Sequence, residues 1–185
     1  MHSSAGALEW QAVARGQVEG IGSTPQMIVK AADGSLLPVP ALESSVVHGR
    51  AALAFLVAWL NEAFAGARIV GVGHRVVHGG PNHSSPVVVT PAILDELRKL
   101  EPLAPLHQPY NLGAIDAVAQ RLPGVPQVAC FDTSFHRGQP AVAELVPLPQ
   151  EIRRTGVQRY GFHGLSYEYI ASVLPEVAPE IADGR

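Results

Sequence analysis

Residues 125–132 read Val-Pro-Gln-Val-Ala-Cys-Phe-Asp, a mostly apolar run that ends in an acidic side chain. Short runs of this kind are typical of a buried strand. Two similar runs, Arg68–Val72 and Pro86–Val89, precede it in the chain. Helical patterns lie between these strands, and a polar residue follows the carboxyl end of the last one. Together these features predict an α/β fold.

The chain before the first of these strands shows a hairpin pattern and a helix pattern. Met27–Lys30 and Leu36–Val39 flank Ala-Asp-Gly-Ser and predict a β-hairpin. The segment Ser45–Phe64 predicts a helix because its apolar residues recur every three or four positions. The residues of that apolar face are Leu53, Leu56, Val57, Leu60 and Phe64.

Two helices are predicted between the second and third strands. Thr90 followed by Pro91 is a typical helix start, with a capping hydroxyl and a proline in the first turn, and this helix runs to about Leu100. Glu101–Pro109 holds three prolines and predicts a loop. Asn111 is expected to cap a helix that runs through Arg121, and a last helix starts near Ser166. The residues expected to face inward from the 111–121 helix are Ile115, Val118 and Ala119.

Composition limits the classes of function. The chain of 185 residues has a net charge of −3, which gives no argument for nucleic acid or an anionic membrane as a partner. Its one cysteine, Cys130, excludes an internal disulfide framework and fits a reducing compartment. The longest apolar run, Ala51–Leu60, is too short to span a bilayer, and no signal-peptide pattern precedes it. We expect a soluble, cytoplasmic protein.

Four stretches place charged or imidazole side chains beside glycine or proline, and two of them precede the 125–132 strand. Residues 73–80 read Gly-His-Arg-Val-Val-His-Gly-Gly. Arg75 suits a small carboxylate or phosphate because its guanidinium pairs with two oxygens, although a solvated arginine at a strand end fits equally well. Residues 104–109 read Ala-Pro-Leu-His-Gln-Pro, and His107 is either a donor to a substrate or an ordinary loop histidine.

The other two stretches follow that strand. Residues 130–136 read Cys-Phe-Asp-Thr-Ser-Phe-His, and Asp132 is placed to bind Mg²⁺ indirectly, to orient a nucleophile, or only to cap the next turn. Residues 160–164 read Tyr-Gly-Phe-His-Gly. Flanking glycines let the backbone come close to a ligand, so His163 is a candidate to stabilise a phosphoryl group in transfer.

The spacing of three histidines raises zinc as an alternative. His74, His78 and His83 lie close together in a chain with eight histidines. The first two would share a face only in a helix, and the valines, glycines and prolines around them disfavour a helix. We therefore expect no metal ligands among these residues.

Taken together and in order, the four stretches resemble the acetate kinase family over residues 67–171, with propionate and butyrate kinases open as close relatives. The resemblance implies transfer of the γ-phosphoryl group of ATP to acetate or another short-chain carboxylate, with Mg²⁺, giving an acyl phosphate and ADP. It implies the fold of the actin, sugar kinase and Hsp70 superfamily, in which two ribonuclease H-like lobes enclose the site. A homodimer is the assembly common in that family.

The resemblance also implies roles for individual residues. Arg75 would bind the carboxylate, and Asp132 would be the catalytic acidic residue that positions substrate and metal. His163 would stabilise the transferring phosphoryl group, and His107 would hydrogen-bond the same region. The residues expected to line a small apolar pocket for the acyl group are Val77, Leu106 and Phe162.

Three departures from the family pattern affect these expectations. The family's early Asn-x-Gly-Ser-Ser-Ser-x-Lys turn has no counterpart in this sequence. The chain ends at Arg185, before the family's second catalytic arginine, its metal-binding glutamate and most of its nucleotide site. A Thr-Ser-His segment of the family is replaced by Leu165-Ser166-Tyr167. We expect residues 1–185 to form a partial N-terminal, carboxylate-binding lobe without its first strand and without the C-terminal nucleotide-binding lobe.

These departures bear on activity. Loss of one positioned donor typically costs about 10²–10³ in rate, and loss of a lobe removes the nucleotide site itself. We therefore expect the isolated chain to have no useful kinase activity. The alternative to a truncated enzyme is a non-catalytic remnant that still binds a small carboxylate or a protein partner.

Overall fold

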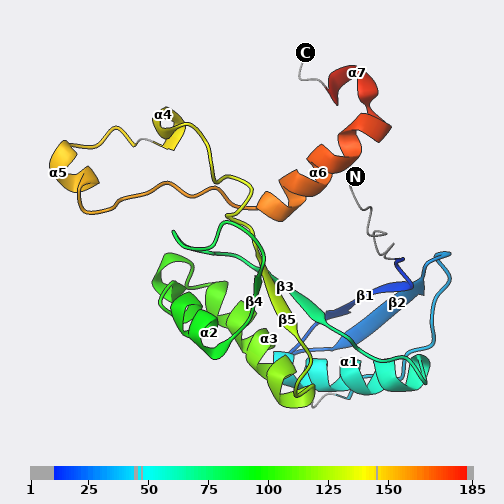
Figure 1. Cartoon of the computed structure of the whole chain (residues 1–185). Helices are drawn as coiled ribbons and strands as arrows, with labels where there is room; N and C mark the ends of the chain where they lie inside the picture. Colours follow the sequence, from blue (N-terminus) through cyan, green and yellow to red (C-terminus); the bar gives the residue numbers. More distant parts are fainter. Residues whose placement is uncertain (1–10, 44–45, 47, 145, 183–185) are drawn as a thin grey trace, which may run out of the picture. The chain divides into compact units, whose positions relative to one another are not determined.

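In the computed structural model, which describes residues 11–43, 46, 48–144 and 146–182, the chain divides into two units at Ala67 and Arg68. The first unit is built on strands β1 (Ala14–Glu19) and β2 (Gln26–Ala31), which pair antiparallel (Figure 1). Helix α1 (Gly49–Ala63) packs on this hairpin. The buried side chains at that contact are Met27, Val29 and Trp59.

The predicted hairpin is confirmed only as a short antiparallel turn, in which the Ala31 N–H donates to the Ser35 carbonyl and the Leu37 N–H to the Val29 carbonyl, both at 2.9 Å. β2 agrees with the predicted Met27–Lys30 strand, but the strand that pairs along its whole length is β1 and not Leu36–Val39. The latter segment contributes one isolated bridge, between Lys30 and Leu36, beyond a tight turn. Pro38 and Pro40 lack the N–H groups that a second ladder needs.

A three-stranded sheet forms the centre of the second unit, in the order β3-β5-β4. β3 (Val72–Val76) runs parallel to β5 (Gln127–Phe131), and the two-residue β4 (Val87–Val88) pairs antiparallel with β5. The strand predicted at 68–72 thus starts four residues later. Gly71 lies opposite Pro126, which has no N–H, so the ladder begins at the next pair.

Two helices complete the core of the second unit. α2 (Pro91–Arg98) starts at Thr90, whose hydroxyl accepts from the Ile93 N–H at 3.3 Å, as predicted. A short 3₁₀ turn, η1 (Glu101–Leu103), leads to α3 (Gln108–Arg121), which packs on β3 and on α2. The buried hydrophobic core joins both helices to the sheet through Val76, Leu97, Leu112, Ile115, Ala129 and Phe131.

The predicted orientation of the 111–121 helix is partly wrong. Ile115 and Val118 are buried as expected, but Ala119 is exposed and Ala117 is buried instead. The helix also starts three residues early, with Pro109 inside its first turn. A proline there costs nothing because the first N–H groups of a helix have no intrahelical acceptor.

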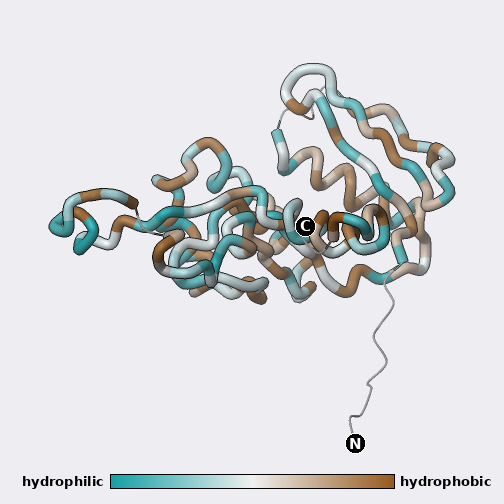
Figure 2. Tube along the Cα trace, turned by 90° about the horizontal axis from the view of Figure 1, so that it is seen from above, coloured by the Kyte–Doolittle hydropathy of each residue, from teal (hydrophilic) through white to brown (hydrophobic). Residues whose placement is uncertain are grey.

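The rest of the second unit lies outside this core. The segment with α4 (Ala141–Glu144) and α5 (Gln150–Arg153) extends from the sheet as an arm (Figure 1), and Figure 2 shows hydrophobic stretches along it. α6 (Gly164–Val177) and α7 (Pro179–Ala182) follow. Among the described residues, no helix combines the length and apolar character needed to cross a membrane.

Candidate functional site

Arg75 and Asp132 meet where β3 and β5 end. Asp132 directly follows β5, and its backbone N–H donates to the Val76 carbonyl at 3.0 Å, which extends the parallel pairing by one residue. Arg75 Nε donates to Oδ1 of Asp132 at 3.0 Å and to Oδ2 at 3.1 Å, and Nη2 donates to Oδ2 at 2.8 Å. Parallel strands bring their carboxyl ends to one edge, so the two side chains form a bidentate ion pair.

The pair is asymmetric in its exposure. The Asp132 side chain is 4% exposed, whereas that of Arg75 is 57% exposed. The hydrogen bonds to Asp132 raise the pKa of Arg75, so the guanidinium stays charged. Its Nη1 makes no hydrogen bond with the described residues. Arg75 is therefore held in place on one side and has donors left for an anion on another.

His163 lies next to this pair in a rare backbone conformation. It precedes α6 with φ 59°, and it is the single non-glycine residue with positive φ in the described part of the chain. Its Nδ1 lies 3.3 Å from Arg75 Nη2. An arginine N–H only donates, so Nδ1 accepts and the neutral ring carries its proton on Nε2. A left-handed non-glycine residue costs roughly 1–3 kcal/mol and persists only where its surroundings hold it, and such strain clusters at functional sites.

The two glycines beside this histidine pack too closely for any side chain. A Cβ on Gly164 would overlap the Asp132 carbonyl oxygen, which accepts from the Gly164 N–H at 2.7 Å. A Cβ on Gly161 would overlap the His136 ring. The Tyr-Gly-Phe-His-Gly pattern is therefore explained by the close approach of segment 160–164 to segment 131–136.

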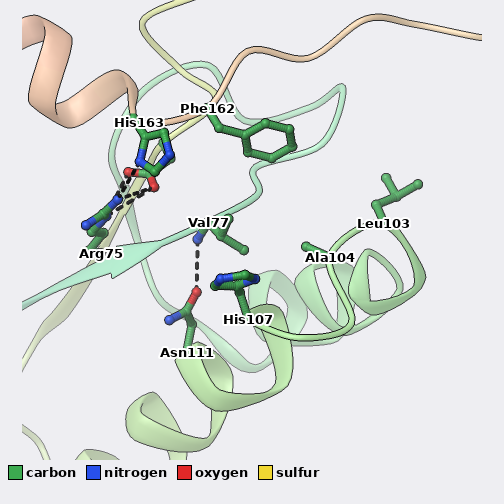
Figure 3. A pocket seen from close by; sticks show the side chains of 9 residues that line it. Arg75, Val77, Leu103, Ala104, His107, Asn111, Phe162 and His163 are labelled. Atoms are coloured by element: carbon green, nitrogen blue, oxygen red, sulfur yellow. Dashed lines mark hydrogen bonds and ion pairs between the residues drawn. The ribbon is translucent and has the colours of Figure 1, made fainter.

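A cavity of about 580 Å³ opens in front of these residues (Figure 3). Ion pair, imidazole, amide and apolar groups share its wall, so it suits a small ligand with one anionic end and one apolar end. The lining residues are Arg75, Val77, Leu103, Ala104, His107, Asn111, Asp132, Phe162 and His163.

Six of the seven predicted site residues line this cavity, and Leu106 does not. The residue is 78% exposed. It lies in the turn before α3, and its side chain faces away from the cavity. Leu103 and Ala104, three and two residues earlier, supply the apolar wall instead. His107, which ends the turn, lines the cavity and makes no side-chain hydrogen bond with the described residues.

Asn111 is a lining residue that the sequence reading did not identify as functional. It was expected to cap a helix, but it lies inside the first turn of α3, four residues after His107 and on the same face. Its Oδ1 accepts from the Val77 N–H at 3.0 Å (Figure 3). This bond fixes the orientation of the Asn111 amide, so its NH₂ group is the end left to donate to a ligand. The i, i+4 spacing from His107 was the signal available in the sequence.

The three closely spaced histidines each have their own partners. His74 Nε2 lies 2.7 Å from Gln127 Oε1, and His83 Nε2 lies 3.2 Å from Glu96 Oε2. His78 Nδ1 accepts from the Gly80 N–H at 2.8 Å, and burial lowers the pKa of His78. In the described ranges, no group of three His, Cys, Asp or Glu side chains is placed to hold a metal ion.

The described residues do not by themselves fit the Mg²⁺ that the family resemblance implies. Asp132 is the one acidic side chain among the lining residues described above, and both of its oxygens accept from Arg75. Magnesium needs several oxygen ligands in octahedral geometry. No step of the chemistry is therefore assigned to a metal held by this chain alone.

The profile of the Acetokinase family matches residues 8–181. The chain belongs to this family. A curated acetate kinase of Rhodopseudomonas palustris (strain ATCC BAA-98 / CGA009) is 47% identical to the chain over 174 residues, which make up 94% of this chain and 44% of that protein. The chain therefore spans less than half the length of this relative.

Solved structures of the family support the fold. Porphyromonas gingivalis acetate kinase matches with a TM-score of 0.75 at 33% identity, over 90% of this chain and 43% of that chain. A propionate kinase from Francisella tularensis subsp. tularensis SCHU S4 matches with a TM-score of 0.78 at 30% identity, over 91% and 43%. The family and the mixed α/β fold of the actin, sugar kinase and Hsp70 type predicted from the four stretches are thus confirmed.

Proposed function

We propose that this chain carries the carboxylate-binding part of an acetate kinase-type enzyme, which phosphorylates acetate or another short-chain carboxylate with ATP and Mg²⁺. The observation that supports this most is the placement of Arg75. Its guanidinium is oriented by a nearly buried carboxylate, and it lines a cavity whose other walls are largely apolar. A short carboxylate combines the same two features in one small molecule.

Binding would use the parts of Arg75 that Asp132 leaves free. The substrate carboxylate would accept from Nη1, which has no partner among the described residues. Its acyl group would lie against Val77 and Phe162, with Leu103 and Ala104 nearby. Arginine suits this task because one planar guanidinium can donate to two carboxylates, to Asp132 through Nε and Nη2 and to the substrate through Nη1.

Catalysis on this side of the site would consist mainly of alignment. A carboxylate oxygen is already a nucleophile at neutral pH, so no strong base is needed, and phosphoryl transfer depends on positioning and charge neutralisation. Asp132 holds Arg75. His163, with its proton on Nε2, and His107 would donate hydrogen bonds to oxygens near the reacting carboxylate. Magnesium-bound ATP would supply the phosphoryl group.

A carboxylate-binding chain without kinase activity is the second candidate. It is favoured by the absence, among the described residues, of a set of ligands for Mg²⁺. The lack of activity of the isolated chain, a homodimer and a cytoplasmic location all stay predictions. Both candidates require the same carboxylate site, so binding is the first property to test.

The test is a titration of the isotope-labelled 185-residue chain, followed by NMR, with acetate and with acetamide as its neutral isostere. We expect acetate to shift the amide resonances of residues 75–77 and 161–164 in a saturable manner, and acetamide to leave them unchanged. Equal shifts with both ligands, or shifts confined to other residues, would contradict a carboxylate site at Arg75.

A further inference from the structure

Segment 160–164 brings two side chains to the cavity, and its backbone conformation depends on contacts with neighbouring residues. Phe162 and His163 both line the cavity. His163 has φ 59°, which a non-glycine residue adopts only when neighbouring contacts hold it there. The contacts that hold this segment therefore control the position of both side chains.

His136 makes one of these contacts, although it does not itself line the cavity. Its Nε2 lies 2.8 Å from the Phe162 carbonyl oxygen. A carbonyl only accepts, so Nε2 carries a proton and donates. The ring also lies so close to Gly161 that a Cβ there would overlap it. His136 thus contacts the segment through a hydrogen bond and through packing, one and two residues before His163.

Two aromatic rings hold the His136 ring in turn. Tyr167 in α6 lies edge-on to it with ring centroids 5.4 Å apart, and Phe135 lies edge-on at 5.5 Å. Tyr167 and Phe135 stack on each other at 5.9 Å. The imidazole therefore packs between α6 and the chain after β5, with its Nε2 facing the Phe162 carbonyl.

Segments 160–164 and 131–136 are also joined by a hydrogen bond directly after His163. The Gly164 N–H donates to the Asp132 carbonyl at 2.7 Å. The Phe162 and Tyr160 rings lie edge-on to the buried His78, with centroids 5.8 and 4.4 Å away. Contacts therefore hold the chain both before and after His163. The side-chain hydrogen bond from His136 fixes the Phe162 carbonyl, which directly precedes His163.

We infer that His136 is a positioning residue, which keeps Phe162 and His163 at the cavity by donating a hydrogen bond to the Phe162 carbonyl. The inference rests on the proposed function for its effect on carboxylate binding, but its effect on the His163 backbone is independent of that function. It goes beyond the implied roles of the family resemblance because His136 touches neither Arg75 nor the cavity.

The test compares three variants of the 185-residue chain. H136L removes the donor at similar volume, and H136Q keeps an amide donor of similar reach. H74L is the matched control, because it removes a histidine hydrogen bond of 2.7 Å in the same unit but outside the cavity. Two quantities are measured by NMR: the φ angle of His163 from backbone scalar couplings, and the dissociation constant for acetate.

We expect H136L to lose the positive φ of His163 in a share of the molecules and to bind acetate about three- to tenfold more weakly, the range set by one lost hydrogen bond. H136Q and H74L should keep the positive φ and bind as the unchanged chain does. Comparable thermal midpoints for H136L and H74L would separate positioning from a loss of stability.

The inference is overturned if His163 keeps its φ in H136L, or if H136Q loses it as fully as H136L. If H136L does not fold, H136F, which keeps an aromatic ring beside Tyr167 but donates nothing, replaces it; failure of both to fold would show a structural role and overturn the inference. If the unchanged chain binds no acetate, the proposed function fails, and the His163 φ angle still decides the role of His136.

Discussion

Replacing Asp132 with asparagine tests how the negative charge of Asp132 affects the affinity of the cavity for acetate. In the unchanged chain, the carboxylate neutralises Arg75 through hydrogen bonds of 2.8–3.1 Å. A carboxylate ligand at Arg75 Nη1 would therefore meet the guanidinium and, behind it, a second negative charge. D132N removes that charge and keeps a side chain of the same shape. We expect D132N to bind acetate more tightly.

The magnitude follows from Coulomb's law. A ligand carboxylate at Nη1 would lie about 6 Å from that of Asp132, and the half-exposed guanidinium implies an effective dielectric constant of about 40–80. The repulsion that D132N removes is then about 0.7–1.4 kcal/mol, or about three- to tenfold in the dissociation constant. Because salt screens exposed charges, the gain should shrink as the ionic strength approaches about 1 M.

The assay is the acetate titration at low and at high salt, with acetamide as the neutral control. A near-ultraviolet circular dichroism spectrum checks that D132N keeps its tertiary structure. Weaker acetate binding by a folded D132N at low salt would refute the reasoning, because Asp132 would then contribute something other than a charge that competes with the ligand. An increase that is the same at both salt concentrations would refute its electrostatic origin.

Two further predictions concern stability. Burial lowers the pKa of His78 below its ordinary value, so at acidic pH the unfolded chain binds more protons than the folded chain, and the free energy of unfolding falls as the pH drops below about 6.5. Urea denaturation at pH 7 and pH 5 should show a smaller fall in this free energy for H78N than for the unchanged chain, and equal falls would contradict this. G164A places a Cβ against the Asp132 carbonyl and should cost about 1–3 kcal/mol in urea denaturation. G113A, inside α3 with open space around it, should instead stabilise by about 0.5–1 kcal/mol; equal effects of the two variants would show that close packing at Gly164 is unimportant.

The sequence predicted the edge of the sheet that carries Arg75 and Asp132 better than it predicted the first unit. β5, with Asp132 directly after it, and the capped start of α2 were predicted because their signals are local: an apolar run with a polar end, and a hydroxyl followed by proline. β1 (Ala14–Glu19) was missed because its alternation of Ala14, Gly16 and Val18 with polar residues rests on alanine and glycine, which are weak strand formers. That strand depends on pairing with β2 and on packing against α1.

The candidate site shows the same division. Charged and imidazole side chains next to glycine or proline marked Arg75, Asp132, His107 and His163, and the structure brings these four together at one cavity. Leu106 and Asn111 were misjudged because the start of α3 decides which way each side chain faces. That start lies at Gln108, and the sequence does not reveal it because the residue before it, His107, makes no side-chain capping bond of the kind that Thr90 makes in α2.

The measurement that tests the central claim most directly is the acetate affinity of R75Q beside that of R98Q. Both variants remove an arginine from an ion pair in the second unit, but Arg98 pairs with Asp95 and Asp116 and does not line the cavity. We predict that R75Q loses saturable acetate binding while R98Q keeps the affinity of the unchanged chain. Acetate binding that survives in a folded R75Q, or that falls equally in both variants, would contradict a carboxylate site at Arg75.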